Sequence, residues 1–264
     1  AKDLAGQGVK ELILVAQETT LYGRDLYGHK ALPELLKRLC EIGELSWIRL
    51  LYCYPEEIDD DLIEMIRKEE KICNYLDIPI QHASDAVLKR MGRKTDQKSI
   101  RDLIGKLRER IPDICIRTTL ITGFPGETQE DHEILMDFVK EMEFDRLGVF
   151  PYSREEGTPA YDFDGQVDED VAKERMDAIM LLQKKICSRK DHELIGKTMR
   201  VLVEGRLVGE DAYTARTYRD APEVDGSLFI TTKRELMSGD LVDVIVTGAY
   251  EYDLIGELAD ESCK

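Results

Sequence analysis

Short apolar runs alternate with longer stretches of helical spacing along the first half of the chain. The apolar runs fall at residues 11–16, 48–53, 75–80, 114–121 and 145–150. Between them, apolar residues recur every three or four positions, as from Leu32 to Leu39. Short continuous apolar runs are typical of parallel strands buried on both faces, and right-handed helical crossovers join such strands. We therefore predict an α/β domain of five parallel strand–helix units.

A long amphipathic pattern follows these units. It runs from Asp168 to about Glu193 and places Val171, Ile179 and Ile186 on one face. We predict a single helix that closes a first domain spanning residues 1–193. A closed eight-unit barrel would need more repeats than this domain contains.

The pattern changes after Gly196. Short strand-like segments separated by Gly and Asp turns lie at residues 198–203, 212–216, 227–230, 241–246 and 252–256. This spacing predicts a small five-stranded antiparallel, OB-like β-barrel over residues 194–264. Such barrels often bind nucleic acid, but acidic residues outnumber basic ones here, whereas a tRNA-binding module is usually basic.

Composition narrows the class of protein. The chain has 264 residues, of which 42% are hydrophobic, so it can bury a core. No apolar run approaches the roughly 20 residues of a membrane span, and residues 1–5 lack the apolar core of a signal peptide, so we expect a cytoplasmic protein without membrane contact. The formal charge of −17 opposes non-specific binding to phosphate backbones, although a local basic patch could survive within it.

The six cysteines form no close pair. They are Cys40, Cys53, Cys73, Cys115, Cys187 and Cys263. Neither a zinc knuckle nor an iron–sulfur loop can be assembled from this spacing. We predict reduced, mostly structural cysteines and no metal ligand within the chain.

Polar residues at the ends of the predicted strands are the candidate site. Residues 117–127 read as a strand, a tight turn with Gly123 and Gly126, and the start of a helix. Glycines there let a ligand approach the backbone, and free helix N–H groups can bind an anion or a polar cofactor edge. An ordinary connecting turn is the alternative. His82, which follows another strand, is equally compatible with catalysis and with a structural hydrogen bond.

Four stretches resemble the radical S-adenosylmethionine domain and TRAM domain of methylthiotransferases. They are residues 14–20, 75–84, 117–127 and 216–226. The last stretch, which includes Val224-Asp225, is similar to the RimO branch, which modifies an aspartate of the twelfth small-subunit ribosomal protein. The MiaB branch, which acts on tRNA adenosine, tends to carry Asn-Arg there. The resemblance implies a partial TIM-like (β/α) barrel lacking its first strand, followed by the TRAM barrel.

The resemblance also implies a chemistry and a set of site residues. S-adenosylmethionine bound to a four-iron four-sulfur cluster would be cleaved to a deoxyadenosyl radical, and a second such cluster and an electron donor protein would complete the reaction. Arg117 would meet the methionine carboxylate, while Gly123 and Phe150 would pack the adenine. The full set of cofactor-binding residues that we predict is Gln17, Thr19, Gln81, His82, Ser84, Arg117, Thr119, Gly123 and Phe150.

Several alternatives stay open. Arg117 could instead pair with a neighbouring strand-end acid. The family's three cluster cysteines belong before the start of this chain, so we expect a truncated enzyme that is inactive by itself, with no catalytic residue assigned in this chain; a non-catalytic binding module is the competing reading. We expect the acidic TRAM domain, including Glu223 and Asp225, to bind a basic ribosomal protein rather than tRNA.

Overall fold

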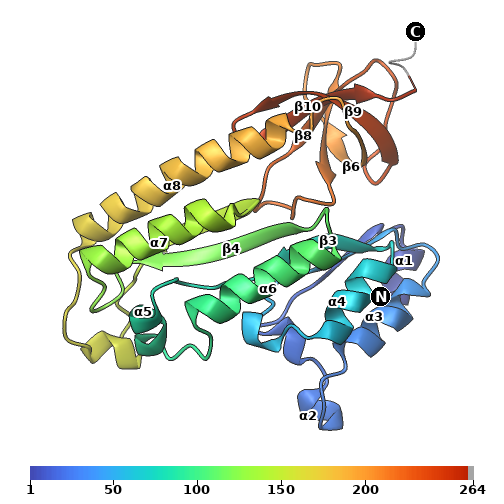
Figure 1. Cartoon of the computed structure of the whole chain (residues 1–264). Helices are drawn as coiled ribbons and strands as arrows, with labels where there is room; N and C mark the ends of the chain where they lie inside the picture. Colours follow the sequence, from blue (N-terminus) through green and yellow to red (C-terminus); the bar gives the residue numbers. More distant parts are fainter. Residues whose placement is uncertain (261–264) are drawn as a thin grey trace.

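The computed structural model describes residues 1–260 and consists of a helix-covered parallel sheet followed by a small β-barrel. Figure 1 shows the long helix α8 (Glu169–His192) leading from the sheet to the barrel. This arrangement confirms the predicted fold of a partial parallel barrel and a second β-barrel.

The sheet contains five parallel strands in chain order, as predicted from the apolar runs. They are β1 (Glu11–Leu14), β2 (Trp47–Leu50), β3 (Ile72–Asp77), β4 (Cys115–Thr122) and β5 (Arg146–Pro151). β1 forms one edge of the sheet and pairs only with β2 among the described strands. Helical crossovers return the chain to the same end after every strand, so all five carboxyl ends meet at one edge.

Helices follow the strands, with additional helices at the start of the chain and within two crossovers. Before α8 they are α1 (Lys2–Gly6), α2 (Arg24–Tyr27), α3 (Leu32–Cys40), α4 (Asp60–Lys68), α5 (Asp85–Arg90), α6 (Gln97–Arg110) and α7 (Gln129–Met142), with 3-10 turns at Thr19–Leu21, Pro55–Glu57 and Pro159–Asp162. Asp59 and Asp96 cap α4 and α6 by accepting from Leu62 N–H at 3.0 Å and Ser99 N–H at 2.7 Å. Within residues 1–260, no helix combines the length and apolarity that crossing a membrane requires.

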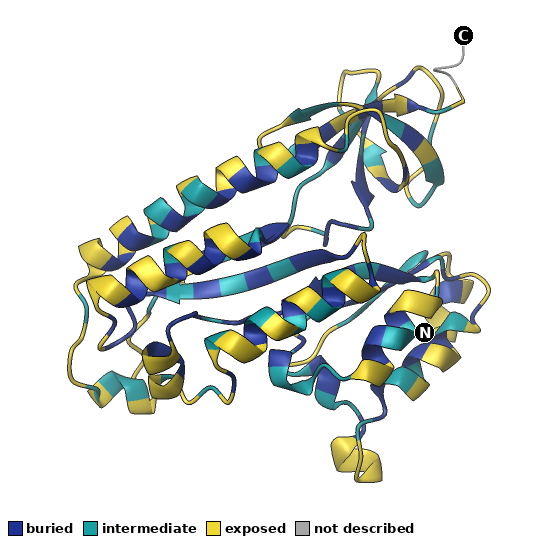
Figure 2. Cartoon of the chain, viewed as in Figure 1, coloured by how far each residue is buried: buried dark blue, intermediate teal, exposed yellow. Residues whose placement is uncertain are grey.

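Helices cover one face of the sheet, and residues of the C-terminal barrel contact part of the other face. In β4, Ile116 and Leu120 belong to the main core with α6 and α7, whereas Cys115 belongs to a separate cluster with residues of the β-barrel. Figure 2 shows the same alternation of buried and less buried positions along β4. We call the face without helices the concave face.

The C-terminal barrel is closed and mixed. Its strands are β6 (Thr198–Arg206), β7 (Ala212–Thr217), β8 (Leu228–Thr231), β9 (Leu241–Tyr250) and β10 (Asp253–Leu258), in the order β10-β8-β7-β6-β9. The prediction that all pairs are antiparallel is wrong for one pair, since β8 and β10 run parallel. The reason is that β9 crosses over to pair with β6, and the hairpin back to β10 brings the chain beside β8 in the same direction.

The barrel sits against the concave face through the loop between β7 and β8, which we call the docking loop (residues 218–227). Its Ala221 joins a buried cluster with Trp47, Tyr75 and Cys115 of the sheet. The docking loop therefore covers the amino ends of β2 and β4 and reaches Tyr75 in the second half of β3.

Candidate functional site

Two non-glycine residues with left-handed backbone mark the carboxyl ends of neighbouring strands. Tyr52, after β2, has φ 56°, and Gln81, after β3, has φ 69°. Asp77 holds Tyr52 by accepting its N–H at 3.1 Å, and β4 holds Gln81 through Thr119 O and Ile121 N. Such strained residues persist only where the surroundings fix them, and they cluster at functional sites. The sequence contained no signal for Tyr52 or for the strain at either residue.

Of the two predicted site residues after β1, one is exposed and the other is buried. Gln17 is exposed. Thr19 is buried, donates its hydroxyl to Leu51 O at 2.6 Å and accepts from Ala16 N–H at 3.2 Å. Thr19 therefore ties the loop after β1 to the end of β2, and Gln17 is the member of this pair that can reach a ligand.

His82 and Ser84 lie inside the protein. His82 Nδ1 accepts from Ser84 N–H at 2.9 Å, so its hydrogen is on Nε2, which faces no acceptor among the described residues. Burial lowers the pKa of His82 to about 4, an effect that nearby Asp131 opposes. Ser84 is at the N-cap position of α5, as predicted, but its hydroxyl donates to Asp131 at 2.5 Å instead of capping the helix. Both side chains thus hold the loop, and their contact with a ligand stays a prediction.

The N–H groups of the turn after β4 bind a carboxylate of the protein itself. The carboxylate of Glu127 accepts from the N–H groups of Gly123 and Phe124 and pairs with Arg175 of α8 at 3.1 Å. Burial raises the pKa of Glu127, and Arg175 opposes that shift. These N–H groups are therefore not free to bind an external anion, contrary to what the glycine pattern led us to expect.

Gly123 itself serves packing against α8. Its φ is 73°, and a Cβ placed on it would lie 2.4 Å from Cβ of Ala172. The space that the missing side chain leaves is thus filled by the protein. Phe150 on β5, by contrast, is 57% exposed, and Thr119 on β4 is partly exposed. Of the predicted adenine contacts, Phe150 is the one with a free surface.

Arg117 lies on the concave face between two acids. Its Nη1 donates to Asp77 at 2.9 Å and to Thr119 at 3.3 Å, and its Nε lies 3.4 Å from Asp225 of the docking loop. The pairing with Asp77 is the strand-end ion pair that we considered as the alternative for this residue. Arg117 pairs in register with Asp77, the last residue of β3, so it lies level with the carboxyl end of that strand while β4 continues to Thr122.

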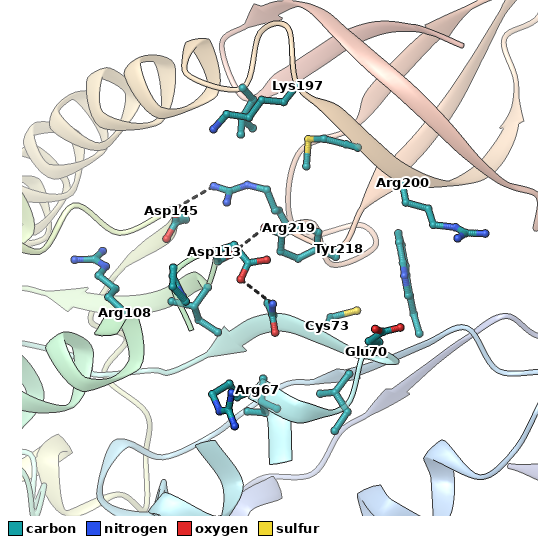
Figure 3. Close-up of a pocket in the computed structure, with 18 of the residues that line it drawn as sticks. Arg67, Glu70, Cys73, Arg108, Asp113, Asp145, Lys197, Arg200, Tyr218 and Arg219 are labelled. Atoms are coloured by element: carbon teal, nitrogen blue, oxygen red, sulfur yellow. Dashed lines mark hydrogen bonds and ion pairs between the residues drawn. The ribbon is translucent and has the colours of Figure 1, made fainter. Parts of the chain in front are cut away.

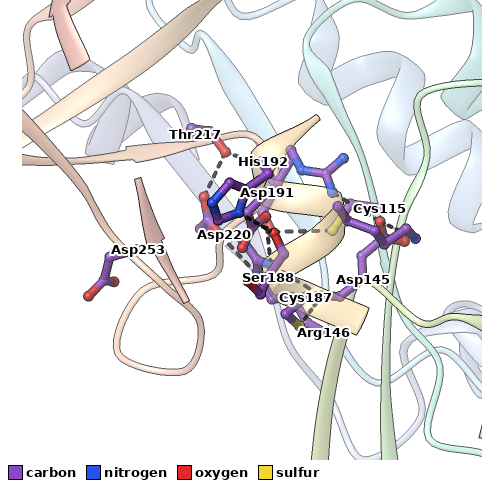
Figure 4. A network of polar contacts seen from close by, with 12 residues as sticks. Cys115, Asp145, Arg146, Cys187, Ser188, Asp191, His192, Thr217, Asp220 and Asp253 are labelled. Carbon is purple, nitrogen blue, oxygen red and sulfur yellow. Dashed lines mark hydrogen bonds and ion pairs between the residues drawn. The ribbon is translucent and has the colours of Figure 1, made fainter. Parts of the chain in front are cut away.

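The docking loop is fixed by buried charges. Arg49 donates to Tyr218 O at 2.7 Å, and Arg146 pairs with Asp220 at 2.7 Å. Figure 4 shows the polar contacts around Arg146, whose ion-pair partners are Asp220 and Asp191. Burial raises the pKa of Asp191, and Arg146 opposes the shift. Buried ion pairs of this kind are strongly destabilising to break, because one charge is left uncompensated.

Asp225 is not a surface acid. Its side chain is 3% exposed, and it accepts from Tyr75 Oη at 2.7 Å and from Ala221 N–H at 2.9 Å. The expectation that Asp225 meets a basic partner directly is therefore corrected by the structure. The sequence could not show this, because Tyr75 and Asp225 are 150 positions apart. Glu223 remains exposed.

A groove of about 810 Å³ separates the barrel from the amino ends of β3 and β4. Arg219 of the docking loop and Asp145 of the sheet meet in it at 2.9 Å (Figure 3). Burial alone would raise the pKa of Asp145, but Lys190 and Arg219 lower it. The groove lies at the opposite end of the strands from Tyr52 and Gln81, so it belongs to the domain junction.

The described cysteines do not fit an iron–sulfur cluster. Cys53, Cys73, Cys115 and Cys187 are buried and Cys40 is half-buried, and burial raises the pKa of every one of these thiols. No group of three His, Cys, Asp or Glu residues within 1–260 is arranged to hold a metal. Cys263 lies outside the described residues.

Comparisons with known proteins agree with this architecture. The radical SAM superfamily model matches residues 1–139, and the TRAM domain model matches residues 195–259. A ribosomal protein uS12 methylthiotransferase RimO from Lachnoclostridium phytofermentans is 57% identical over 97% of this chain and 58% of its own length. The RimO from Acetivibrio thermocellus is 53% identical over 100% of this chain and 58% of its own length. The chain thus spans about 58% of the length of these relatives.

One solved structure supports the fold alone. Coproporphyrinogen III oxidase (HemN) from Escherichia coli, described as a radical SAM enzyme, superposes with a TM-score of 0.50 at 16% identity. The match covers 70% of this chain and 51% of that one.

Proposed function

Because the chain belongs to the radical SAM superfamily and carries a TRAM domain, we propose that it forms part of a methylthiotransferase that acts on an aspartate of ribosomal protein uS12. The observation that carries this proposal is the likeness to RimO proteins along nearly the whole chain. A cytoplasmic location follows from such a substrate. The boundary between the two domains, which we place between residues 193 and 194, is part of the same proposal.

S-adenosylmethionine is the proposed cofactor, and when bound with its cluster it supplies a carbon radical that abstracts hydrogen. The carboxyl ends of the strands would hold it, and Gln17, Gln81, Thr119 and Phe150 have surface available there. Thr19, His82, Ser84 and Gly123 would shape the loops around it from inside. This support role differs from the direct contacts that we predicted from the sequence.

The chain by itself is proposed to lack cluster binding and cofactor cleavage. Four of its described cysteines are buried and Cys40 is half-buried, and no three His, Cys, Asp or Glu residues within 1–260 are arranged to hold a metal. Anaerobic incubation with iron and sulfide should therefore give no cluster absorbance, and dithionite with S-adenosylmethionine should give no deoxyadenosine. Stoichiometric iron or deoxyadenosine would contradict this. In the complete enzyme, two four-iron four-sulfur clusters and an electron donor protein are part of the proposal.

The substrate is tested in cells. We expect co-expression of the complete gene with uS12, in a host without its own activity, to add a methylthio group to uS12 that mass spectrometry of the protein detects. Digested tRNA from the same cells tests the MiaB-like alternative. Modified adenosine with unmodified uS12 would replace the proposal, and modification of neither would favour a binding module.

A further inference from the structure

Basic residues gather in one segment of an otherwise acidic chain. Residues 184–200, which form the last turns of α8 and the start of β6, contain six Lys or Arg and two Asp or Glu, whereas the whole chain contains 37 and 54. One of these two acids, Asp191, is buried beside Arg146. The surface of this segment is therefore more basic than its composition indicates.

The basic side chains of α8 lie on one exposed face of the helix. A hollow of about 490 Å³ on this face is lined by Leu181, Lys184, Lys185, Ser188, Arg189 and His192. The opposite face, with Ile186 and Cys187, is buried. Spacings of three and four residues place Lys185, Arg189 and His192 in a row along the helix. That row is about 10 Å long, since a helix rises about 1.5 Å per residue.

Lys197 continues this row past the end of α8. Its backbone N–H donates to Leu194 O at 2.9 Å, in a tight turn that directly follows the helix. Its side chain is exposed at the groove of about 810 Å³ between the barrel and the sheet (Figure 3). We call Lys184, Lys185, Arg189 and Lys197 the basic strip.

Two members of the basic strip, Lys185 and Lys197, have no ion pair or side-chain hydrogen bond with the described residues. The other two have exposed partners. Lys184 pairs with Glu251 at 2.8 Å and Arg189 with Glu143 at 2.6 Å, and these four side chains are 43–49% exposed. Pairs as exposed as these contribute at most about 1 kcal/mol, so an external anion can replace the acid.

We propose that the basic strip binds the phosphate backbone of RNA. A row of Lys and Arg neutralises successive phosphates without reading the bases. RNA is the polyanion that accompanies the acceptor of the proposed function, because a ribosomal protein is bound to ribosomal RNA. The inference rests on the proposed function for this choice of polyanion, and it adds a second contact, away from the strand ends.

The length of α8 sets the distance between the basic strip and the proposed cofactor site. Arg175 of α8 pairs with Glu127 of the turn after β4 at 3.1 Å, so this part of the helix is level with the end of β4. Lys185 is ten residues further along α8, a distance of about 15 Å. About five nucleotides, at roughly 3.4 Å each, span that distance. An acceptor at the strand ends and RNA along α8 can thus be bound together.

Fluorescence anisotropy on the 264-residue chain tests the proposal. The probe is a labelled single-stranded RNA of mixed sequence, titrated at about 50 mM and about 200 mM salt. We expect micromolar binding at the lower salt. Affinity should fall at least tenfold at the higher salt, because each neutralised phosphate releases counterions whose release is less favourable in salt.

Removal of charge identifies the surface that binds. Lys185→Gln and Lys197→Gln break no ion pair, and the double variant should weaken RNA binding at least tenfold and make it less dependent on salt. Lys37→Gln is the matched control, because Lys37 is an exposed cation in the last turn of α3 that has no ion pair among the described residues. This variant should bind RNA as the wild type does. Thermal melts check that each variant is folded.

Three outcomes would overturn the proposal. The first is that the chain does not bind RNA at the lower salt, and the second is that Lys37→Gln weakens binding as much as the double variant does. The third is that polyglutamate of the same length binds more tightly than RNA, which would assign the basic strip to an acidic protein. Modification of uS12 in cells decides the proposed function separately, so modified uS12 without RNA binding counts against this inference alone.

Discussion

Glu127 illustrates how a single residue can change the meaning of a glycine-rich turn. The spacing of Gly123 and Gly126 is typical of turns that bind ligands, yet the carboxylate of Glu127 binds the N–H groups of Gly123 and Phe124. A residue pattern specifies the shape of such a turn better than its occupant, because the occupant depends on which side chains reach it. The turn is therefore held by the protein itself.

Gly123 should tolerate no side chain. We expect Gly123→Ala to lower the free energy of unfolding by about 1–3 kcal/mol, since a left-handed backbone disfavours alanine and the new Cβ would meet Ala172 of α8. Gly105→Ala is the matched control, because Gly105 lies within the exposed face of α6 with nothing within 4 Å. That change should stabilise by about 0.5–1 kcal/mol. Urea denaturation measures both, and equal effects would contradict the account.

His82 should make stability depend on pH. Its pKa is about 4 in the folded protein and about 6.5 when unfolded, so the unfolded chain binds more protons between these values. The neutral His82 side chain therefore contributes fully to the free energy of unfolding above pH 6.5. This contribution, about 3 kcal/mol in total, is lost as the pH falls toward 4. Urea denaturation at several pH values should give a flatter profile for His82→Gln than for the wild type. The exposed His29→Gln variant should keep the wild-type profile.

At the scale of elements, local pattern was enough to place the strands and helices. Apolar runs located β1, β2, β4 and β5 closely, while the third run, at residues 75–80, lies three residues beyond β3 at Ile72–Asp77; the spacing of Leu32 to Leu39 located α3. The parallel pairing of β8 with β10 was missed, because strand partners in a barrel depend on the path of the chain and not on alternation within a strand. The hydrogen bond from Ser84 to Asp131 was missed for the same reason, since it joins two helix starts that are 47 positions apart.

The start of α7 gives a test at this scale. Thr128 accepts from Asp131 N–H at 3.2 Å and Asp131 accepts from Thr128 N–H at 2.9 Å, which is a capping box. Thr128→Ala should lower the free energy of unfolding by about 1 kcal/mol, whereas Thr128→Ser keeps the hydroxyl and should change it little. Chemical denaturation of both variants decides the matter. Equal stability of the two would show that the cap contributes nothing.

At the scale of the whole molecule, the contact between the two parts could not be read from the sequence. Arg49 donates to Tyr218 O, which is 169 positions away, and Tyr75 of β3 donates to Asp225 of the docking loop. An acidic stretch looks the same in a sequence whether its charges face solvent or a buried arginine. The acidic surface that we expected around residues 221–226 is therefore smaller than composition indicated.

The buried pair of Arg146 and Asp220 should hold the two parts together. We expect Asp220→Asn to lower the free energy of unfolding by about 3 kcal/mol, because Asp191, at the longer distance of 3.5 Å, is then the one carboxylate paired with Arg146 among the described residues. Calorimetry should also show the single transition separating into two as the barrel undocks. Asp211→Asn, which breaks the exposed pair with Arg206, should cost less than about 1 kcal/mol. A single unchanged transition for Asp220→Asn would contradict this.

The docking loop limits how this protein can be recombined. A chimera that exchanges only residues after 195 for a barrel without an acid at position 220 would leave Arg146 without its 2.7 Å partner, whereas Arg49 would keep Glu11 of β1. Exchange would work between relatives only when the sheet positions travel with the barrel. For anyone who wishes to graft a new recognition module onto this scaffold, the unit to transplant is the barrel together with the strand residues beneath its loop.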